Sequence, residues 1–145
     1  MKTFTDSSDR TWSINLNIDS AKRVRDLLGV NLLEPENGDP PLLTRLGTDE
    51  ILLCDVIYCL CKPQADQLNV SDQQFGQSMG GETILAAQKA FYEELIDFFQ
   101  KRGRRDRAKA VAAQAKVIET AIRTIEQRVD AIDIDKLIDG TISGR

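Results

Sequence analysis

A repeating stripe of apolar residues in the C-terminal third constrains the fold of this 145-residue chain most strongly. Successive stripe residues are alternately three and four positions apart; they are Ala108, Val111, Ala115, Ile118, Ile122, Ile125, Val129 and Ile132. This heptad pattern is typical of a helix that keeps one narrow face against another helix. The sequence therefore predicts a long helix over residues 101–136, which could serve as an interaction arm, followed by a frayed tail at residues 137–145.

Three arrangements could cover this heptad stripe. A helix of such length gains little from intrinsic propensity and depends on burial of its apolar face. The stripe could pack on an amphipathic helix predicted over residues 82–100, which gives a helical hairpin. It could instead bind another chain, and the residues for that contact are Val111, Ile118, Ile122, Ile125 and Val129. A third arrangement divides the stripe, with its first part packed inside the chain and its last part free.

The N-terminal segment has the alternating pattern of a β-strand. Trp12, Ile14, Leu16 and Ile18 alternate with polar residues, as in a strand with one buried face. Residues 3–5 can pair with this strand across a run of turn-forming residues. Because an isolated two-stranded hairpin is only marginally stable in water, we expect this one to pack on helices or on another chain.

Short helices are predicted between the hairpin and the long helix. One covers residues 21–28 and ends at Gly29, which suits the left-handed position after a helix. A nearly all-apolar helix starts at Thr48 and is expected to end before Pro63, because a proline disfavours the α conformation of the residue before it. The predicted fold is mainly α (α+β), with a small N-terminal β-hairpin packed on a helical bundle in a compact domain over residues 1–100.

A basic segment separates the last two predicted helices. Residues 101–107 contain five positive side chains and one aspartate, so their net charge is 5 − 1 = +4. The segment could be a solvated helix junction, a contact for an acidic protein segment, or a contact for nucleic acid. Nucleic acid is disfavoured because interleaved aromatic residues are missing and the chain has a formal net charge of −4. The residues that would contact a partner are Arg102, Arg104, Arg105 and Arg107.

The sequence has no constellation typical of an enzyme. Histidine is absent, which removes the commonest general base and the commonest metal ligand. Cys54, Cys59 and Cys61 lack the spacing of a zinc site and are expected to be buried, reduced thiols. We therefore expect no catalytic residue, no metal and no cofactor, and a protein that works by binding another protein.

Membrane insertion is not predicted either. No window reaches the roughly 18 apolar residues that suggest a transmembrane helix. The first residues also lack the apolar region of a secretory signal. The sequence therefore predicts a cytoplasmic protein that does not contact membranes.

Several short segments together give residues 2–100 a characteristic pattern of apolar and turn positions. They are FTD at residues 4–6, RTWSI at 10–14, KRVR at 22–25, GVNLL at 29–33, LLCDVIY at 52–58, VSDQQFG at 70–76 and EELIDFF at 93–99. In this pattern residues 2–100 resemble the tail assembly chaperones of tailed bacteriophages and prophages.

This resemblance implies a non-enzymatic assembly factor that binds the tape-measure protein or the tail-tube protein in the cytoplasm of the infected host. It carries over no ligand residue. The alternatives are a structural subunit of the phage tail or virion and a nucleic-acid-associated regulator. Self-association of the chain remains open as well.

Overall fold

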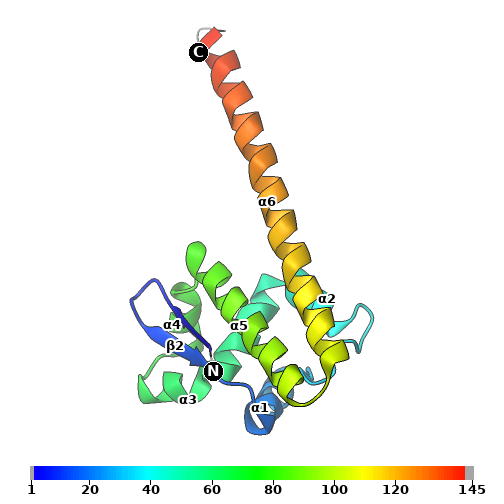
Figure 1. The fold of residues 1–145 in the computed structure, drawn as a ribbon. Helices are drawn as coiled ribbons and strands as arrows, with labels where there is room; N and C mark the ends of the chain where they lie inside the picture. Colours follow the sequence, from blue (N-terminus) through cyan, green and yellow to red (C-terminus); the bar gives the residue numbers. More distant parts are fainter. Residues whose placement is uncertain (1, 143–145) are drawn as a thin grey trace. The chain divides into compact units, whose positions relative to one another are not determined.

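The computed structural model describes the backbone of residues 2–142 and the side chains of residues 2–121 and 123–131. Within this range the chain is mainly α-helical, with one small antiparallel hairpin at its N-terminus (Figure 1). The elements are β1 (Lys2–Thr5), β2 (Thr11–Ile14), α1 (Ile18–Leu28), α2 (Leu42–Thr48), α3 (Glu50–Gln67), α4 (Asp72–Gln77), α5 (Glu82–Lys101) and α6 (Arg105–Ile142). The hairpin packs on the helical bundle, so the predicted mainly α (α+β) fold is confirmed.

The chain divides into two units, residues 1–115 and residues 116–145. The first unit extends past residue 100, where the sequence analysis ended the compact domain, because Ala108 and Val111 in the first turns of α6 are also buried. The backbone is helical as far as Ile142, although fraying was expected from residue 137, and no proline interrupts this segment. Residues 143–145 of the expected tail lie outside the described residues.

The N-terminal hairpin rests on two helices of the first unit. In its antiparallel register Phe4 lies opposite Trp12 and Lys2 lies opposite Ile14. Phe4, Trp12 and Ile14 are buried, while β1 contacts mainly α5 and β2 contacts mainly α3. The expectation that helices or another chain would cover this hairpin is met by helices of the same chain.

Helix α3 is the central element of the first unit. It contacts β2 and also α1, α2, α4 and α5. Its Tyr58 lies 5.2 Å from Phe75 of α4, and Phe75 in turn makes an edge-to-face contact with Trp12 at 5.1 Å between ring centroids. Such aromatic pairs add about 0.5–1.5 kcal/mol beyond the area that they bury. The hairpin, α3 and α4 therefore share one aromatic core.

The prediction that Pro63 ends this central helix is wrong. Helix α3 passes through Pro63 and continues to Gln67. A proline has no N–H, so the carbonyl of Cys59 loses the hydrogen bond that it would accept from residue 63. The guanidinium of Arg23 in α1 replaces that donor, with its Nη1 2.8 Å from the Cys59 oxygen. A tertiary contact thus satisfies the carbonyl that the proline leaves open.

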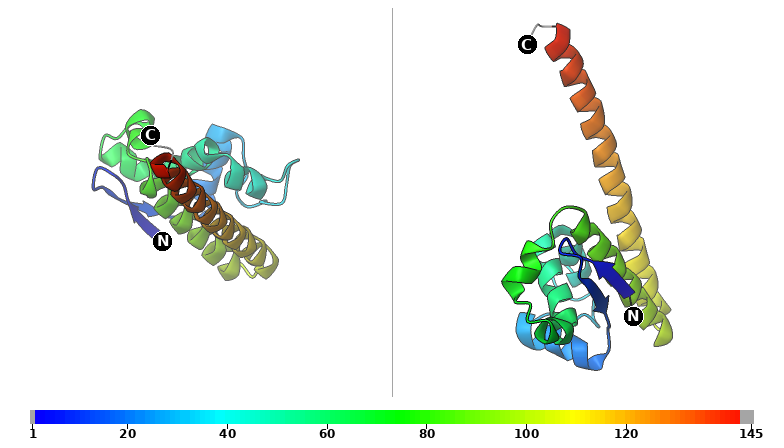
Figure 2. Two further views of the ribbon diagram at one scale, coloured as in Figure 1. Left: turned by 90° about the horizontal axis from the view of Figure 1, so that it is seen from above. Right: turned by 90° about the vertical axis from the view of Figure 1, so that its left-hand side faces the viewer.

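The predicted amphipathic helix over residues 82–100 is present as α5. Its buried face includes Ala87, Phe91, Leu95 and Phe99. Within the first unit, the C-terminal half of α5 and the first turns of α6 lie side by side in the views of Figures 1 and 2. This pairing places the start of the heptad stripe against the bundle.

Candidate interaction surface

The first part of the heptad stripe belongs to the core of the first unit. Ala108 is 4% exposed and Val111 is fully buried. Val111, which the sequence analysis considered for partner binding, is therefore covered by the chain itself. The predicted helical hairpin thus forms along this part of α6.

The second part of the stripe is open. In the second unit Ile125 is 58% exposed, Val129 is 47% exposed, and Ile118 is half-buried. The side chain of Ile122 lies outside the described residues. For the residues that the structure describes, the stripe follows the divided arrangement, with its first part packed and its later part free.

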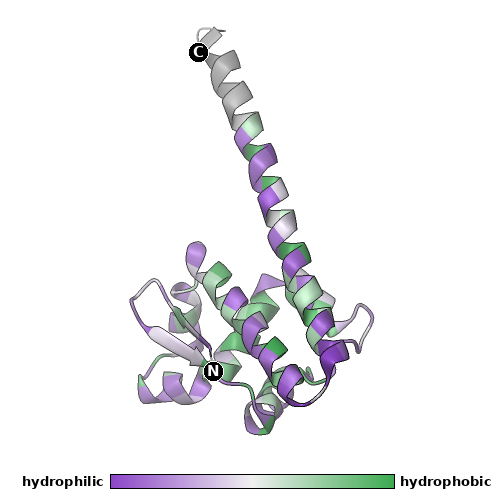
Figure 3. Cartoon of the chain, viewed as in Figure 1, coloured by the Kyte–Doolittle hydropathy of each residue, from purple (hydrophilic) through white to green (hydrophobic). Residues whose placement is uncertain are grey.

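The second unit contains no buried side chain among its described residues, 116–121 and 123–131. Apolar and polar residues are interspersed along this part of α6 (Figure 3). Glu119 and Arg123 form an ion pair one turn apart, and both side chains are exposed, so the pair adds little stability. A helix without tertiary burial is marginal in water. The exposed stripe is therefore the clearest candidate surface for another protein.

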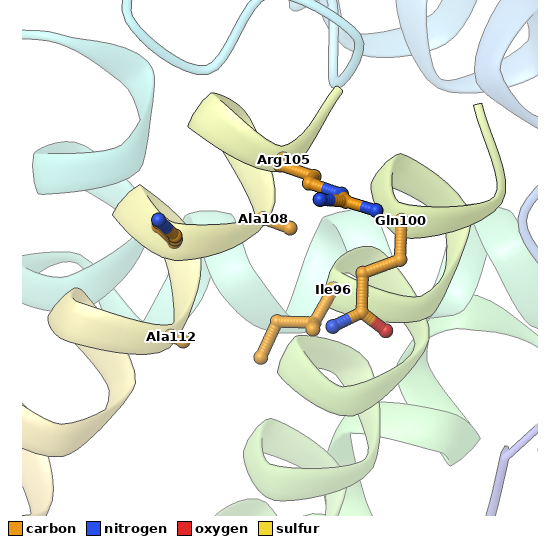
Figure 4. A pocket seen from close by; sticks show the side chains of 6 residues that line it. Ile96, Gln100, Arg105, Ala108 and Ala112 are labelled. Atoms are coloured by element: carbon orange, nitrogen blue, oxygen red, sulfur yellow. The ribbon is translucent and has the colours of Figure 1, made fainter. Parts of the chain in front are cut away.

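An open hollow lies between α5 and the first turns of α6, with a volume of about 420 Å³. In Figure 4, Ile96 and Gln100 extend from α5 toward this hollow, and Ala108 and Ala112 form its wall on α6. Arg105 lies at its rim beside Gln100. Because its polar groups are at the exposed rim, the hollow lacks the enclosed, converging polar groups of a small-molecule site.

The basic junction between α5 and α6 uses most of its charges internally. Arg104 makes a two-pronged contact with Asp106, at 3.0 Å from Nε and 2.8 Å from Nη2. Arg107 donates to Glu36 at 2.6 Å, and Lys101 lies 2.9 Å from Asp97. With these three carboxylates counted, the net charge of the junction becomes 5 − 3 = +2.

These contacts lower the pKa values of the acidic partners, as expected for carboxylates beside arginines. The hydrogen bonds from Arg104 hold the pKa of Asp106 far below its usual value. Partial burial alone would raise the pKa of Glu36, but the hydrogen bond and charge of Arg107 outweigh it and lower that pKa. The carboxylates therefore stay charged at neutral pH and keep neutralising the junction.

Two arginines of the junction also cover aromatic rings of α5. The guanidinium of Arg102 lies 5.4 Å from the ring centre of Phe98, and that of Arg107 lies 5.9 Å from the ring centre of Phe99. Arg105 is exposed and forms no ion pair with any residue that the structure describes. This arrangement favours a structural helix junction, and it leaves Arg105 as the positive group most available to a partner.

The outer edge of β2 is closed by a side chain that the sequence analysis missed. Gln64 of α3 accepts a hydrogen bond from the Ser13 N–H at 3.1 Å and donates one to the Thr11 carbonyl at 2.7 Å. Its amide thus occupies the place of a neighbouring strand, which blocks an edge that could otherwise pair with another chain. No local pattern marks Gln64, because its contacts join residues 51 and 53 positions apart.

The three thiols are poorly suited to chemistry. Burial raises the pKa of Cys61 to about 12. Cys54 is half-buried and not fully buried as expected, and this burial, together with the charges of nearby Asp55 and Asp72, raises its pKa to about 11. Since the thiolate is the reactive form, these cysteines are held in their unreactive state. Among the described residues, no three cysteine or carboxylate side chains come together in a way that could hold a metal ion.

Neither the helices of the described residues nor a comparison with known proteins points to another candidate site. None of the helices in the described part of the chain has the length and apolar character needed to cross a membrane. A comparison of the chain with protein-family models, curated proteins and solved structures finds no match. The open stripe on α6 is thus the feature of this chain that most needs a functional explanation.

Proposed function

We propose that this chain is a non-enzymatic assembly factor that binds another protein through the exposed stripe of α6. The observation that carries the proposal is the exposure of Ile125 and Val129 on a helix with no buried side chain among its described residues beyond Ala115. Fully burying an aliphatic side chain contributes about 1.5–3 kcal/mol. A partner that covers both residues therefore gains appreciable binding energy from them.

The shape of the surface favours a protein partner. Small molecules bind in concave pockets that enclose most of their surface, whereas this stripe lies along one face of a helix. Amphipathic helices bind by placing such a face in an apolar groove or against another helix. The complementary partner is a polypeptide with an apolar helical stripe or groove of its own.

The phage tail provides the most specific version of this proposal. Residues 2–100 resemble the tail assembly chaperones, and a chaperone of that kind would cover apolar helical surface on the tape-measure or tail-tube protein before assembly. An acidic chain with a partly neutralised basic junction also suits a protein partner better than a nucleic acid. We propose that the chain acts in this way in the cytoplasm of the infected host.

Co-expression followed by affinity capture tests the proposal. The tagged chain is produced together with tape-measure and tail-tube proteins of tailed phages and with the proteins encoded by its neighbouring reading frames, and the captured polypeptides are identified by mass spectrometry. We expect Ile125→Asp to weaken capture by about 10- to 100-fold, because it removes the burial of one aliphatic side chain. Val117→Asp is the matched control, since Val117 is 62% exposed on the same helix but lies outside the stripe.

Two results would contradict this function. Capture of neither tail protein by the unaltered chain would remove the phage-tail assignment. Equal capture by Ile125→Asp and by the unaltered chain would remove the stripe from the binding surface. Mass spectrometry of finished particles separates the two tail-related functions, because a chaperone is released and a structural subunit is retained.

A further inference from the structure

We infer that the exposed stripe of α6 packs against the same stripe in further copies of this chain, in a parallel helical bundle. This inference goes beyond the proposed function, because it concerns the chain in the absence of any tail protein. It rests on the residue types in the stripe and on the charges that flank it.

The stripe has the residue types of a multi-stranded bundle. In heptad terms, Ile118 and Ile125 occupy d positions and Val129 occupies an a position, while the sequence spacing also assigns Ile122 to an a position. β-Branched residues at both positions favour bundles of three or four helices over pairs. Ile125 and Val129 are exposed in the single chain, so they are available for such packing.

The charges beside the stripe select a parallel arrangement. Glu119 and Glu126 occupy e positions, and Ala121 and Arg128 occupy g positions. All four side chains are exposed in the single chain. In a parallel bundle each e position lies beside a g position of the neighbouring helix. Glu126 then meets a neutral Ala121 of the next copy, so that no like charges come together there.

An antiparallel arrangement has the opposite electrostatics. It brings e positions of neighbouring helices together, so that Glu119 of one copy approaches Glu126 of the other. Like charges placed side by side destabilise a helical interface. The same pattern disfavours unrelated helices with acidic flanks, whereas a parallel copy of this chain presents neutral side chains to both glutamates.

Self-association and partner binding then use one surface in turn. Copies cover the stripe of α6 while the chain is free, and a helical partner replaces or joins them. Because both contacts bury Ile125 and Val129, a helical partner that displaces copies lowers the mass of the free assembly in proportion to the partner added.

Light scattering after size-exclusion chromatography of the purified full chain measures self-association. We expect a mass of three or four chains at high micromolar concentration, with dissociation on dilution. Ile125→Asp should give the mass of a single chain, and Val117→Asp should behave like the unaltered protein. A single-chain mass of the unaltered protein at every concentration, or an unchanged mass for Ile125→Asp, would overturn the inference.

Cysteine cross-linking tests the orientation and does not depend on a disruptive variant. In a parallel bundle the a positions of neighbouring helices face each other, so Val129→Cys should form a disulfide with itself under mild oxidation. An antiparallel arrangement brings a positions beside d positions, so cross-links would then form only in a mixture of Val129→Cys and Ile118→Cys. Cross-links that form only in the mixture would overturn the parallel arrangement. If neither the Val129→Cys sample nor the mixture forms a cross-link, the bundle itself is overturned.

The failures of the two proposals can be told apart. A chain that stays monomeric but captures a tail protein through Ile125 contradicts self-association and supports the proposed function. A chain that associates but captures no tail protein supports the bundle and contradicts the proposed function.

Discussion

The N-terminal hairpin and the second part of α6 present the same physical problem and solve it differently. Neither a two-stranded hairpin nor a single helix is stable in water unless its apolar side is covered. Trp12 of the hairpin is fully buried by helices of the same chain, whereas Ile125 of α6 is 58% exposed. The comparison teaches that apolar patterning alone does not indicate a binding surface, and that only the uncovered stripe calls for a partner.

The hairpin is also fixed by a polar network that has no counterpart among the side chains described in the second unit. The buried carboxylate of Asp6 accepts hydrogen bonds from the Trp12 indole at 2.8 Å and from the backbone of Ser8 and Arg10 at 2.9 and 3.0 Å. Ser7 donates to the Ser78 carbonyl from both its N–H and its hydroxyl group. Turn, strand and the α4–α5 connection are thereby joined.

The largest expected loss of stability follows the removal of the Trp12 side chain from the hairpin. Trp12→Ala should lower the free energy of unfolding by about 3–5 kcal/mol, because it removes a large buried ring and one of the hydrogen-bond donors to the Asp6 carboxylate. Urea unfolding followed by circular dichroism measures the change. Trp12→Phe is the control that keeps much of the apolar volume, and its cost should be about 1–3 kcal/mol. A loss below 1 kcal/mol for Trp12→Ala would mean that the helices do not cover the hairpin as described.

A smaller effect should distinguish the two parts of the heptad stripe. Val111→Ala should destabilise the first unit by about 1.5–3 kcal/mol, because Val111 is fully buried. Val129→Ala should change the stability of the first unit by less than about 0.5 kcal/mol, because Val129 is exposed and belongs to the second unit. Trp12 is the only tryptophan, so its fluorescence during urea unfolding reports on the first unit. Equal losses for the two variants would remove the distinction between a packed and an open part.

The smallest of the three expected effects is the loss of folding stability that acidification causes through Asp6 of the hairpin. Burial alone would raise the pKa of Asp6, but hydrogen bonds from Trp12, Arg10 and Ser8 outweigh it, and the pKa lies below its ordinary value of 3.8. The charged carboxylate therefore stabilises the fold above about pH 3.8, and this contribution is lost as the pH falls through the lowered pKa.

The measurement compares the unaltered chain with Asp6→Asn. Between about pH 6 and pH 3, the urea midpoint of Trp12 fluorescence should fall further for the unaltered chain than for Asp6→Asn, which cannot lose that charge. Glu119→Gln, at an exposed ion pair of α6, is the control and should follow the unaltered chain. Parallel pH profiles for all variants would show that Asp6 contributes no pH-dependent stability.

Much of the fold could be predicted from periodicity. The alternation around Trp12 predicts β2, although the strand ends at Ile14 and Ile18, expected on its buried face, is exposed at the start of α1. The spacing over residues 82–100 predicts α5, and Gly29 marks the end of α1 with a positive φ of 71°. The continuation of α3 through Pro63 could not be predicted, because the compensating donor, Arg23, comes from another helix. The role of Gln64 is hidden for the same reason.

The sequence by itself determined which residues form an apolar stripe, since heptad spacing places them on one side of any helix that forms. It also determined the charge beside that stripe and the absence of histidine chemistry. Only the tertiary structure decided that Val111 is enclosed while Ile125 stays open, and that Glu36, 71 positions away in the sequence, pairs with Arg107 of the basic junction. The physical reason is that periodicity fixes the direction of a side chain, whereas burial and ion pairing depend on distant segments that meet only in the folded chain.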